Sequence, residues 1–341
     1  MLPIGVIIPT RNSMSLLPAH VDMMRPWVAN VAEVVVVDSA SEDGTSDYLK
    51  ANLRHPHLRF FQHPPGLYQS WNFGLAQIQA PYAYISSIGD SISGDGLAHM
   101  HEVAERLKCD VVVSRPEFLD AQRQPLHGRR WPPHDLCETL GLQEPAVVAG
   151  LELFVFALTN ISDALLGNSA SDLHRTTSIQ ARPFPTDYGT SGDAAWGLQH
   201  ALDIRMGVAT KVFSSMLDHP KTYNAREYAV VDLAGRLVQL GIETAQTKRR
   251  GDSALDQRFR AAGLDALLSA MTENLAAQRK LERFRRQHIP WVLNPLAWQA
   301  RLERASARTK LNRLKLECLR RPGAISAAGR TGDLSGGANN Y

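Results

Sequence analysis

Residues 33–45 read EVVVVDSASEDGT, a run of four valines that ends on an aspartate and passes into a turn. A continuous β-branched run predicts a strand that is buried on both faces. Similar apolar runs lie at 4–9, 58–62, 82–87 and 109–114. Helical patterns lie between them, at 15–31, 44–53, 67–79 and 94–107. This alternation predicts an α/β fold with a mostly parallel central sheet.

Polar residues follow several of these predicted strands, where ligands bind in α/β sheets. Pro9-Thr10-Arg11-Asn12 follows the first strand, Asp38-Ser39 the second, and Asp90 the fourth. The glycine patterns typical of dinucleotide-binding and P-loop proteins do not occur in the sequence. The ends of these strands are therefore not expected to bind a dinucleotide or to form a P-loop.

Composition is that of an ordinary globular protein, with 341 residues, 44% apolar and 21% charged. The three cysteines lie far apart, which is typical of a reducing compartment and excludes a disulfide framework. The N-terminal MLPIGVIIPT lacks the basic start and cleavage site of a signal peptide, and no apolar run is long enough to span a bilayer. We therefore expect a cytoplasmic protein.

Positive charge is concentrated near the C-terminus. Residues 279–321 hold thirteen Lys/Arg and three acids, a net charge of +10, which leaves −7 for the remainder of a chain with net charge +3. Trp291 and Trp298 lie within this basic segment. It can contact an anionic bilayer at the inner face of the membrane, or it can pack on its own domain or on a second copy in a homo-oligomer. Nothing else in the sequence supports nucleic-acid binding.

Three blocks resemble the nucleotide-sugar domain of family 2 glycosyltransferases, which have the GT-A fold. They are IIPTRN (7–12), VVVVDSASEDGT (34–45) and GLYQSWNFGLAQIQAPYAYISSIGD (66–90). The resemblance covers residues 3–100 and resumes at GDAAW (192–196). The block at 66–74 is similar to a branch that works on bacterial surface polysaccharides. The resemblance implies inverting transfer of a sugar from a UDP- or dTDP-type donor to a saccharide or lipid-linked acceptor.

The donor site follows from these blocks. Asp38, at a strand end, suits the N3–H of a uracil or thymine ring, and its alternative is a helix N-cap or turn acid. Asp43-Gly44-Thr45 is better explained as the start of the next helix. The expected donor-binding residues are Pro9, Thr10, Arg11, Asn12, Asp38, Ser39, Gly66, Asn72, Ser87, Gly89 and Asp90.

A divalent cation, Mn²⁺ or Mg²⁺, is implied by the resemblance because it stabilises the leaving diphosphate. The family's Asp-x-Asp motif becomes Ser87-Ile88-Gly89 here, and Asp90 is the only acid left at that position. The alternative is that Asp90 is a plain turn residue. His219 is the second metal ligand that the resemblance suggests, and its alternative is a surface turn residue.

The expected catalytic base is Asp193, which matches the family's base position and stands where a helix begins. It can also serve as the cap of that helix. Asp172, His174 and Trp196 are guesses for the acceptor site.

The expected organisation is a glycosyltransferase domain over residues 1–222, with a donor half at 1–114 and an acceptor half at 115–222. A basic helical extension at 223–321 and a disordered tail at 322–341 follow. RRWPPHDL (129–136) predicts a loop, and PAVVAGLELFVFAL (145–158) predicts a buried helix or strand. The missing Asp-x-Asp keeps a non-catalytic nucleotide-sugar-binding protein open, and a sugar nucleotidyltransferase is disfavoured because its Gly-rich basic loop is absent.

Overall fold

The valine run forms the middle of strand β2 (Val31–Asp38) in the computed structural model, which describes residues 1–161, 164–166, 169–218, 232–285 and 295–320. Strand β2 lies between β1 (Leu2–Thr10) and β3 (Leu58–Gln62) and is parallel to both. Val34 and Val36 join one hydrophobic core, and Val35 and Val37 join the other. Both faces of β2 are therefore covered, which explains why its apolar run is continuous.

The described part of the chain forms a nine-stranded sheet in the order β3-β2-β1-β4-β8-β6-β9-β5, with β7 paired to β9. The other strands are β4 (Tyr82–Ile85), β5 (Ser91–Ile92), β6 (Val111–Leu119), β7 (Ala146–Ala149), β8 (Asp172–Arg175) and β9 (Arg205–Leu217). The half from β3 to β4 is parallel, whereas β8 is antiparallel to both β4 and β6. The predicted α/β class and all five predicted strands are confirmed.

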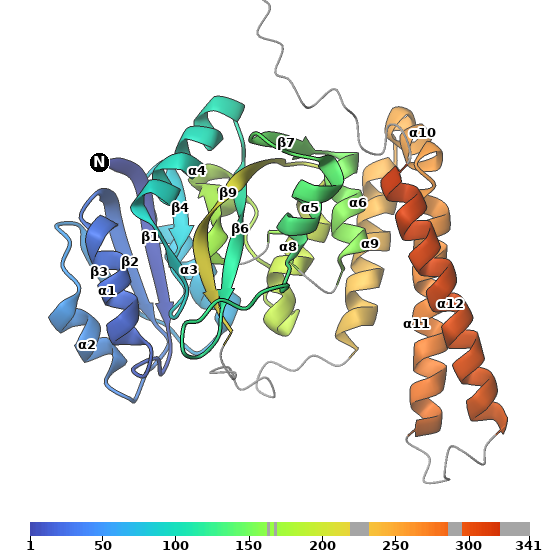
Figure 1. Cartoon of the computed structure of the whole chain (residues 1–341), viewed down its shortest axis with the longest axis horizontal. Helices are drawn as coiled ribbons and strands as arrows, with labels where there is room; N and C mark the ends of the chain where they lie inside the picture. Colours follow the sequence, from blue (N-terminus) through green and yellow to red (C-terminus); the bar gives the residue numbers. More distant parts are fainter. Residues whose placement is uncertain (162–163, 167–168, 219–231, 286–294, 321–341) are drawn as a thin grey trace, which may run out of the picture.

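Helices cover both faces of the sheet (Figure 1). On one face lie α1 (Leu17–Val28), α2 (Thr45–Asn52) and α4 (Gly94–Leu107), whose apolar residues share a core with Val34 and Val36. On the other face lie α3 (Leu67–Gln77), α6 (Leu151–Thr159) and α8 (Gly192–His200). A short helix, α7 (Thr176–Ala181), follows β8. The segment at 145–158 thus supplies both β7 and α6.

Helix α5 (Pro132–Leu140) corrects the loop predicted for RRWPPHDL. The two prolines stand in its first turn, where the missing N–H costs nothing and the fixed φ favours a helix. At this position the two prolines start a helix.

The C-terminal helices are α9 (Leu233–Arg249), α10 (Ser253–Ala261), α11 (Leu264–Arg285) and α12 (Pro295–Arg320). Helix α9 packs on α8, and its Gly241 approaches Leu158 of α6 so closely that an added Cβ would lie 2.7 Å from the leucine Cδ2. Apolar residues of all four helices join the core that contains α6 and α8. The extension therefore shares a core with the sheet, and the domain boundary at 222 stays a prediction.

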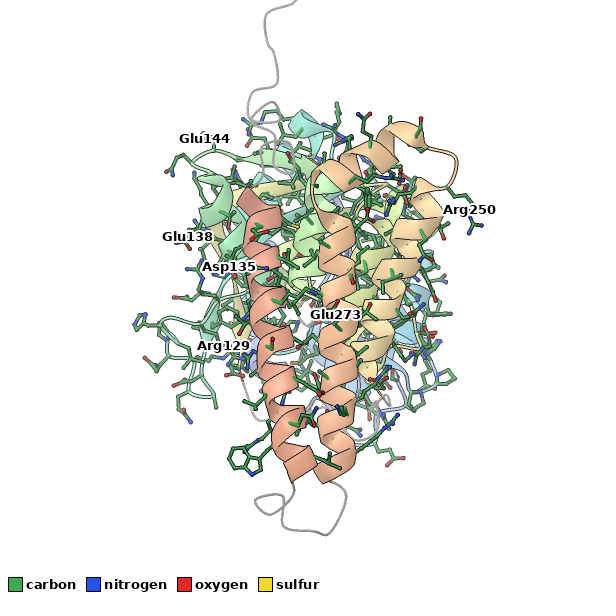
Figure 2. All side chains as sticks on the ribbon, turned by 90° about the vertical axis from the view of Figure 1, so that its right-hand side faces the viewer. Arg129, Asp135, Glu138, Glu144, Arg250 and Glu273 are labelled. Carbon is green, nitrogen blue, oxygen red and sulfur yellow. The ribbon has the colours of Figure 1, made fainter. Side chains whose placement is uncertain are left out.

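Helices α11 and α12 form an antiparallel hairpin along one side of the molecule (Figure 1, Figure 2). Ion pairs between Lys280 and Glu303 (2.6 Å) and between Lys310 and Glu273 (2.7 Å) join the two helices. In Figure 1 the free end of this hairpin and the carboxyl end of β1 both point to the bottom of the view. No helix among the described residues has the length and apolar character needed to cross a membrane.

Candidate functional site

The carboxyl ends of β1 and β2 place Thr10 beside Asp38, since these residues are register partners. The Ser39 amide donates to the Thr10 carbonyl over 2.8 Å. Asp38 is only 2% exposed, and Ser41 donates to its two carboxylate oxygens from its hydroxyl and its amide. Each oxygen of Asp38 keeps a further lone pair, so the carboxylate can still accept a hydrogen bond from a ligand.

The hydroxyl of Thr10 is buried and has no hydrogen-bond partner among the described residues. A buried polar group without a partner costs about 1–3 kcal/mol. Thr10 thus has a free hydrogen-bonding group beside Asp38, and the predicted donor-binding role of both residues stays a prediction.

The loops after β1 and β2 are joined to each other by hydrogen bonds. The Asn12 amide donates to Ser41 Oγ, and the Asn12 side-chain oxygen accepts from the Glu42 amide, both over 2.9 Å. Asp43 accepts from the amides of Met14 (2.9 Å) and Thr45 (3.1 Å), which fits its predicted structural role at the start of α2. Asn12 (φ 46°) and Ala40 (φ 57°) adopt the left-handed region that non-glycine residues rarely occupy. Such strain is typical of loops that hold a ligand.

Helix α3 lies beside the loop that follows β2. Its Ser70 hydroxyl lies 2.7 Å from that of Ser39, and Gly66 is the residue that caps its start. Asn72 points elsewhere, because its side-chain amide donates to the Phe184 carbonyl (2.7 Å) and accepts from the Phe184 amide (2.9 Å). The observed role of Asn72 is to hold the segment before α8, and its donor role stays a prediction.

The loop after β4 carries Asp90 at the same edge of the sheet. Asp90 Oδ1 accepts a hydrogen bond from the Leu217 amide at the end of β9, over 3.0 Å. Gly89 has φ 103°, a conformation that glycine allows readily, and it turns the chain between β4 and Asp90. The Ser87 hydroxyl lies 2.7 Å from the Ser169 hydroxyl, which joins this loop to the segment before β8.

His20 is a residue of this site that sequence reasoning missed. It lies on the buried face of α1, and its ring bridges the Asp90 carbonyl and the Ser86 hydroxyl, both at 3.1 Å. Burial lowers the pKa of His20 to about 4, so the ring is neutral at physiological pH. Nδ1–H then donates to Asp90 O, and Nε2 accepts from Ser86. His20 therefore fixes the backbone that carries Asp90.

The donor set at Asp90 fits a cation held mainly by its substrate. The described residues contain no group of three or more His, Cys, Asp or Glu side chains that could hold a metal ion. Asp90 nevertheless presents a carboxylate with one oxygen fixed by Leu217. Mg²⁺ is commonly bound by one or two carboxylates together with phosphate oxygens and water. The second ligand predicted, His219, lies outside the described residues.

Asp193 stands in the first turn of α8 and is half-buried. Its carboxylate accepts from the Ala194 amide over 2.8 Å and is hydrogen-bonded to the Tyr68 hydroxyl of α3. Burial raises the pKa of Asp193 to about 6, and these two hydrogen bonds limit the rise. A carboxylate with this pKa is ionised at neutral pH yet basic enough to take up a proton.

Asp172 is a second buried carboxyl, 4% exposed, at the start of β8. Because β8 is antiparallel to β4, its start lies at the carboxyl end of β4, and Asp172 interacts electrostatically with Asp193. Burial, and then the charge of Asp193, raise the pKa of Asp172 well above its usual range. The neutral form of Asp172 is therefore favoured relative to that of an ordinary aspartate.

His174 and Trp196, guessed as acceptor residues, are instead core side chains. Each is 1% exposed, and the two rings pack edge to face with centroids 6.1 Å apart. The Trp196 indole N–H donates to the Arg182 carbonyl over 2.5 Å. A sugar cannot stack on a ring enclosed in this way, so the guess for these two residues is corrected. The misleading signal was an aromatic residue beside a predicted catalytic acid.

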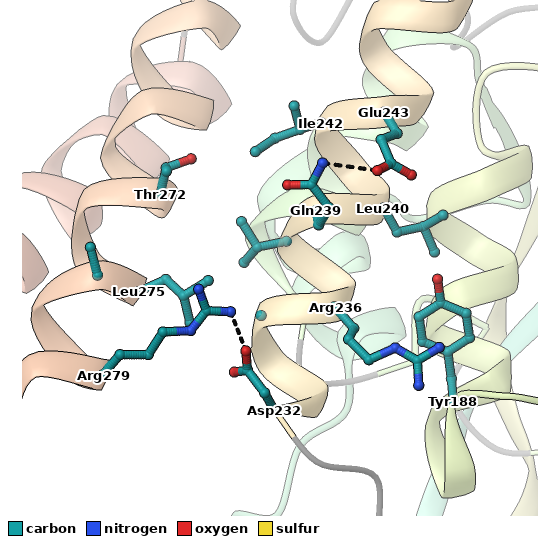
Figure 3. A pocket seen from close by; sticks show the side chains of 13 residues that line it. Tyr188, Asp232, Arg236, Gln239, Leu240, Ile242, Glu243, Thr272, Leu275 and Arg279 are labelled. Carbon is teal, nitrogen blue, oxygen red and sulfur yellow. Dashed lines mark hydrogen bonds and ion pairs between the residues drawn. The ribbon is translucent and has the colours of Figure 1, made fainter. Parts of the chain in front are cut away.

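A groove of about 430 Å³ opens between α9 and α11, beside the segment that leads to Asp193 (Figure 3). Tyr188, at the wall of this groove, packs under the Arg236 guanidinium, with 4.8 Å from the guanidinium carbon to the ring centroid. Arg236 also forms an ion pair with Asp187 over 2.6 Å. Helix α9 thus braces the backbone just before the candidate base.

A family model matches the N-terminal part of the chain. Residues 5–146 match the model of "Glycosyl transferase family 2". The predicted resemblance to this family is confirmed over this range. No curated protein sequence matches the chain.

Solved structures share the fold of this chain. A structure of S. aureus TarS residues 1–349 in complex with UDP-GlcNAc is similar, with a TM-score of 0.55 and 16% identity over 93% of this chain and 92% of that one. Another structure of the same TarS fragment gives a TM-score of 0.50 at 15% identity, with the same coverage of both chains. At these identities the likeness concerns the fold alone, and the predicted GT-A-like fold is confirmed.

Proposed function

We propose that this chain is an inverting glycosyltransferase that moves a sugar from a UDP- or dTDP-type donor to a saccharide or lipid-linked acceptor in bacterial surface polysaccharide synthesis. The observation that carries the proposal is the gathering of acids at one edge of a family 2 domain. Asp38 and Asp90 follow parallel strands of one sheet. Asp172 starts β8 at the carboxyl end of β4, and the charge of Asp193 raises the pKa of Asp172.

In this proposal each acid has a different partner. Asp38 accepts from the N3–H of the base, with Thr10 as a further contact. Asp90 would hold the divalent cation, which stabilises the charge that grows on the leaving diphosphate. Asp193 removes the proton of the acceptor hydroxyl as it attacks C1 of the donor sugar from the opposite face. The UDP-GlcNAc bound in the TarS structure supports a uridine donor.

The cysteines Cys109, Cys137 and Cys318 are buried and lie far apart in the sequence, which supports a reducing compartment, and we place the reaction in the cytoplasm. A transfer assay with radiolabelled donor, run with Mn²⁺ and with chelator, separates an enzyme from a nucleotide-sugar-binding protein. Release or transfer of the sugar supports the proposal. Tight donor binding without turnover, over a range of acceptors and in the absence of acceptor, would favour the non-catalytic alternative.

Asp38→Ala is expected to weaken UDP binding by roughly 10- to 100-fold, because a charged acceptor of the base N3–H is lost. Ser41→Ala is the matched control, since it removes the local bond to Asp38 but leaves the carboxylate. Isothermal calorimetry with UDP and CDP measures both. CDP lacks the N3–H, so wild-type protein should prefer UDP and Asp38→Ala should not. Equal losses in Ser41→Ala and Asp38→Ala would mean that the loop, not the base contact, was disturbed.

The transfer rate is expected to fall as the pH drops below about 6. Asp193 acts as a base only when it is ionised, and burial raises its pKa to about 6. At pH 5 only about a tenth of the molecules would carry the active carboxylate. A profile of kcat/KM against pH at saturating donor tests this expectation. A rate that stays constant down to pH 4.5 would show that a more acidic group is the base.

A further inference from the structure

Exposed apolar side chains gather at one end of α12. Leu296 is 59% exposed, Trp298 47% and Leu302 69%, and all three lie within the first eight residues of this helix. Only three other large hydrophobic side chains of the described residues are as exposed, and these are Met1, Val212 and Leu316. Such clustering marks an interaction surface, whereas isolated exposed leucines do not.

This end of the hairpin is also basic. The part of α11 from 279 to 285 and the part of α12 from 295 to 308 together contain seven Lys/Arg and two acids, a net charge of +5. Arg283 is exposed. The Arg301 guanidinium lies over the Trp298 ring, with its carbon 5.7 Å from the ring centroid. Apolar rings and leucines beside arginines are the combination found in helices that lie at the surface of an anionic bilayer.

The hairpin is held so that this end stands away from the rest of the protein. At the other end of α12, Lys315 donates to the Thr159 carbonyl of α6 over 2.6 Å, and Cys318 is buried. Toward the free end, α12 packs mainly on α11. The ion pair between Lys280 of α11 and Glu303 of α12 joins the two helices there. The views in Figure 1 and Figure 2 agree that this end projects beyond the sheet and its helices.

We infer that the free end of the α11–α12 hairpin docks on an anionic lipid bilayer, with Trp298 and Leu302 entering the headgroup region and Arg283, Arg301 and Arg304 facing lipid phosphates. Each cation near an anionic surface contributes an attraction that corresponds to roughly a fivefold change in binding. Helices α11 and α12 are already ordered by their packing on each other, so docking would lose little further conformational entropy. The docking does not depend on the transferase activity.

Co-sedimentation of the full chain with vesicles tests this inference. The two preparations are phosphatidylcholine alone and an equal mixture of phosphatidylcholine and phosphatidylglycerol. We expect binding to the mixed vesicles at low salt, its loss at high salt, and little binding to phosphatidylcholine. Absence of binding to the mixed vesicles would overturn the inference.

Two sets of variants locate the surface. Changing Arg283, Arg301 and Arg304 together to Gln is expected to weaken binding roughly 100-fold. Trp298→Ala with Leu302→Ala is expected to weaken it at least about tenfold. The matched controls are Arg250→Gln, labelled in Figure 2 far from this end, and Leu316→Ala near the other end of α12; neither should change binding. Equal vesicle binding by the wild type, the triple arginine variant and the Trp298→Ala/Leu302→Ala variant would also overturn the inference.

A second copy of the chain is the alternative occupant. Sedimentation velocity of the same proteins distinguishes it. A wild-type dimer that becomes a monomer in Trp298→Ala/Leu302→Ala, with unchanged vesicle binding, would assign the surface to self-association instead. Calorimetric UDP affinity at the wild-type level in each variant shows that the fold is intact. Because Leu311 and Cys318 are core residues, point variants are better tests here than truncation of the hairpin.

Discussion

Asp193→Asn is expected to bind a UDP-sugar as the wild type does and to lower the transfer rate by about 100-fold or more. The amide keeps the shape of the side chain but cannot take the acceptor proton, and base catalysis is worth roughly 10²–10⁴-fold. Since the base acts only when the hydroxyl attacks, donor affinity should not change. Calorimetry with donor and a transfer assay on the same sample measure the two quantities.

Asp172→Asn is the matched comparison, because Asp172 is a neighbouring buried carboxyl that interacts with Asp193. The raised pKa of Asp172 favours its neutral form, so a neutral amide in its place should keep transfer within about threefold of the wild type. The opposite result, with Asp172→Asn inactive and Asp193→Asn active, would assign the base to Asp172. Wild-type rates in both variants would place the base elsewhere in the chain.

Asp90→Asn is expected to weaken UDP-sugar binding in the presence of Mn²⁺ by at least about tenfold and to lower turnover with it. Removal of groups that merely support metal ligands costs 10- to 100-fold in affinity or activity, so loss of a direct carboxylate ligand should cost no less. Without metal, Asp90→Asn and wild type should bind the donor equally. Calorimetry with Mn²⁺ and with chelator measures the difference, and the exposed Asp95→Asn in α4 serves as control.

The comparison without metal is needed because Asp90 also accepts a backbone hydrogen bond from Leu217. If Asp90→Asn weakens donor binding equally with and without metal, the loss comes from the position of the loop. Asp90 would then be a plain turn residue, and the cation would have to be held by other groups.

The parallel half of the sheet was predictable because its strands are buried on both faces, so the apolar runs are continuous, as at Val34–Val37. The second half was harder to predict. Strand β8 is central and buried but reads DLHR, and β9 contains lysine, serine and threonine, so neither shows the continuous apolar run of the parallel half. The two-residue β5 is defined only by its pairing with β9, which no local pattern could reveal.

Asp38, Asp90 and Asp193 could be proposed from sequence because each stands where a strand ends or a helix begins. His20 could not, since its function depends on Asp90, 70 residues further along the chain. Tyr68 binds the Thr190 carbonyl across 122 residues and reaches Asp193 from another element. Such residues carry no local signal, and their roles arise only from tertiary packing.

The free end of the α11–α12 hairpin and the carboxyl end of β1 point in the same direction (Figure 1). This arrangement affects how an acceptor would reach the proposed donor site. A protein attached to a bilayer through the hairpin would turn the carboxyl ends of its parallel strands, where the donor is proposed to bind, toward that same bilayer. A lipid-linked acceptor would then arrive by lateral diffusion in two dimensions rather than from bulk solution. Confinement of both partners to one surface raises their effective concentration without any new contact at the pocket itself. The rate on a lipid-linked acceptor would then depend on surface density, while the rate on a water-soluble analogue would not.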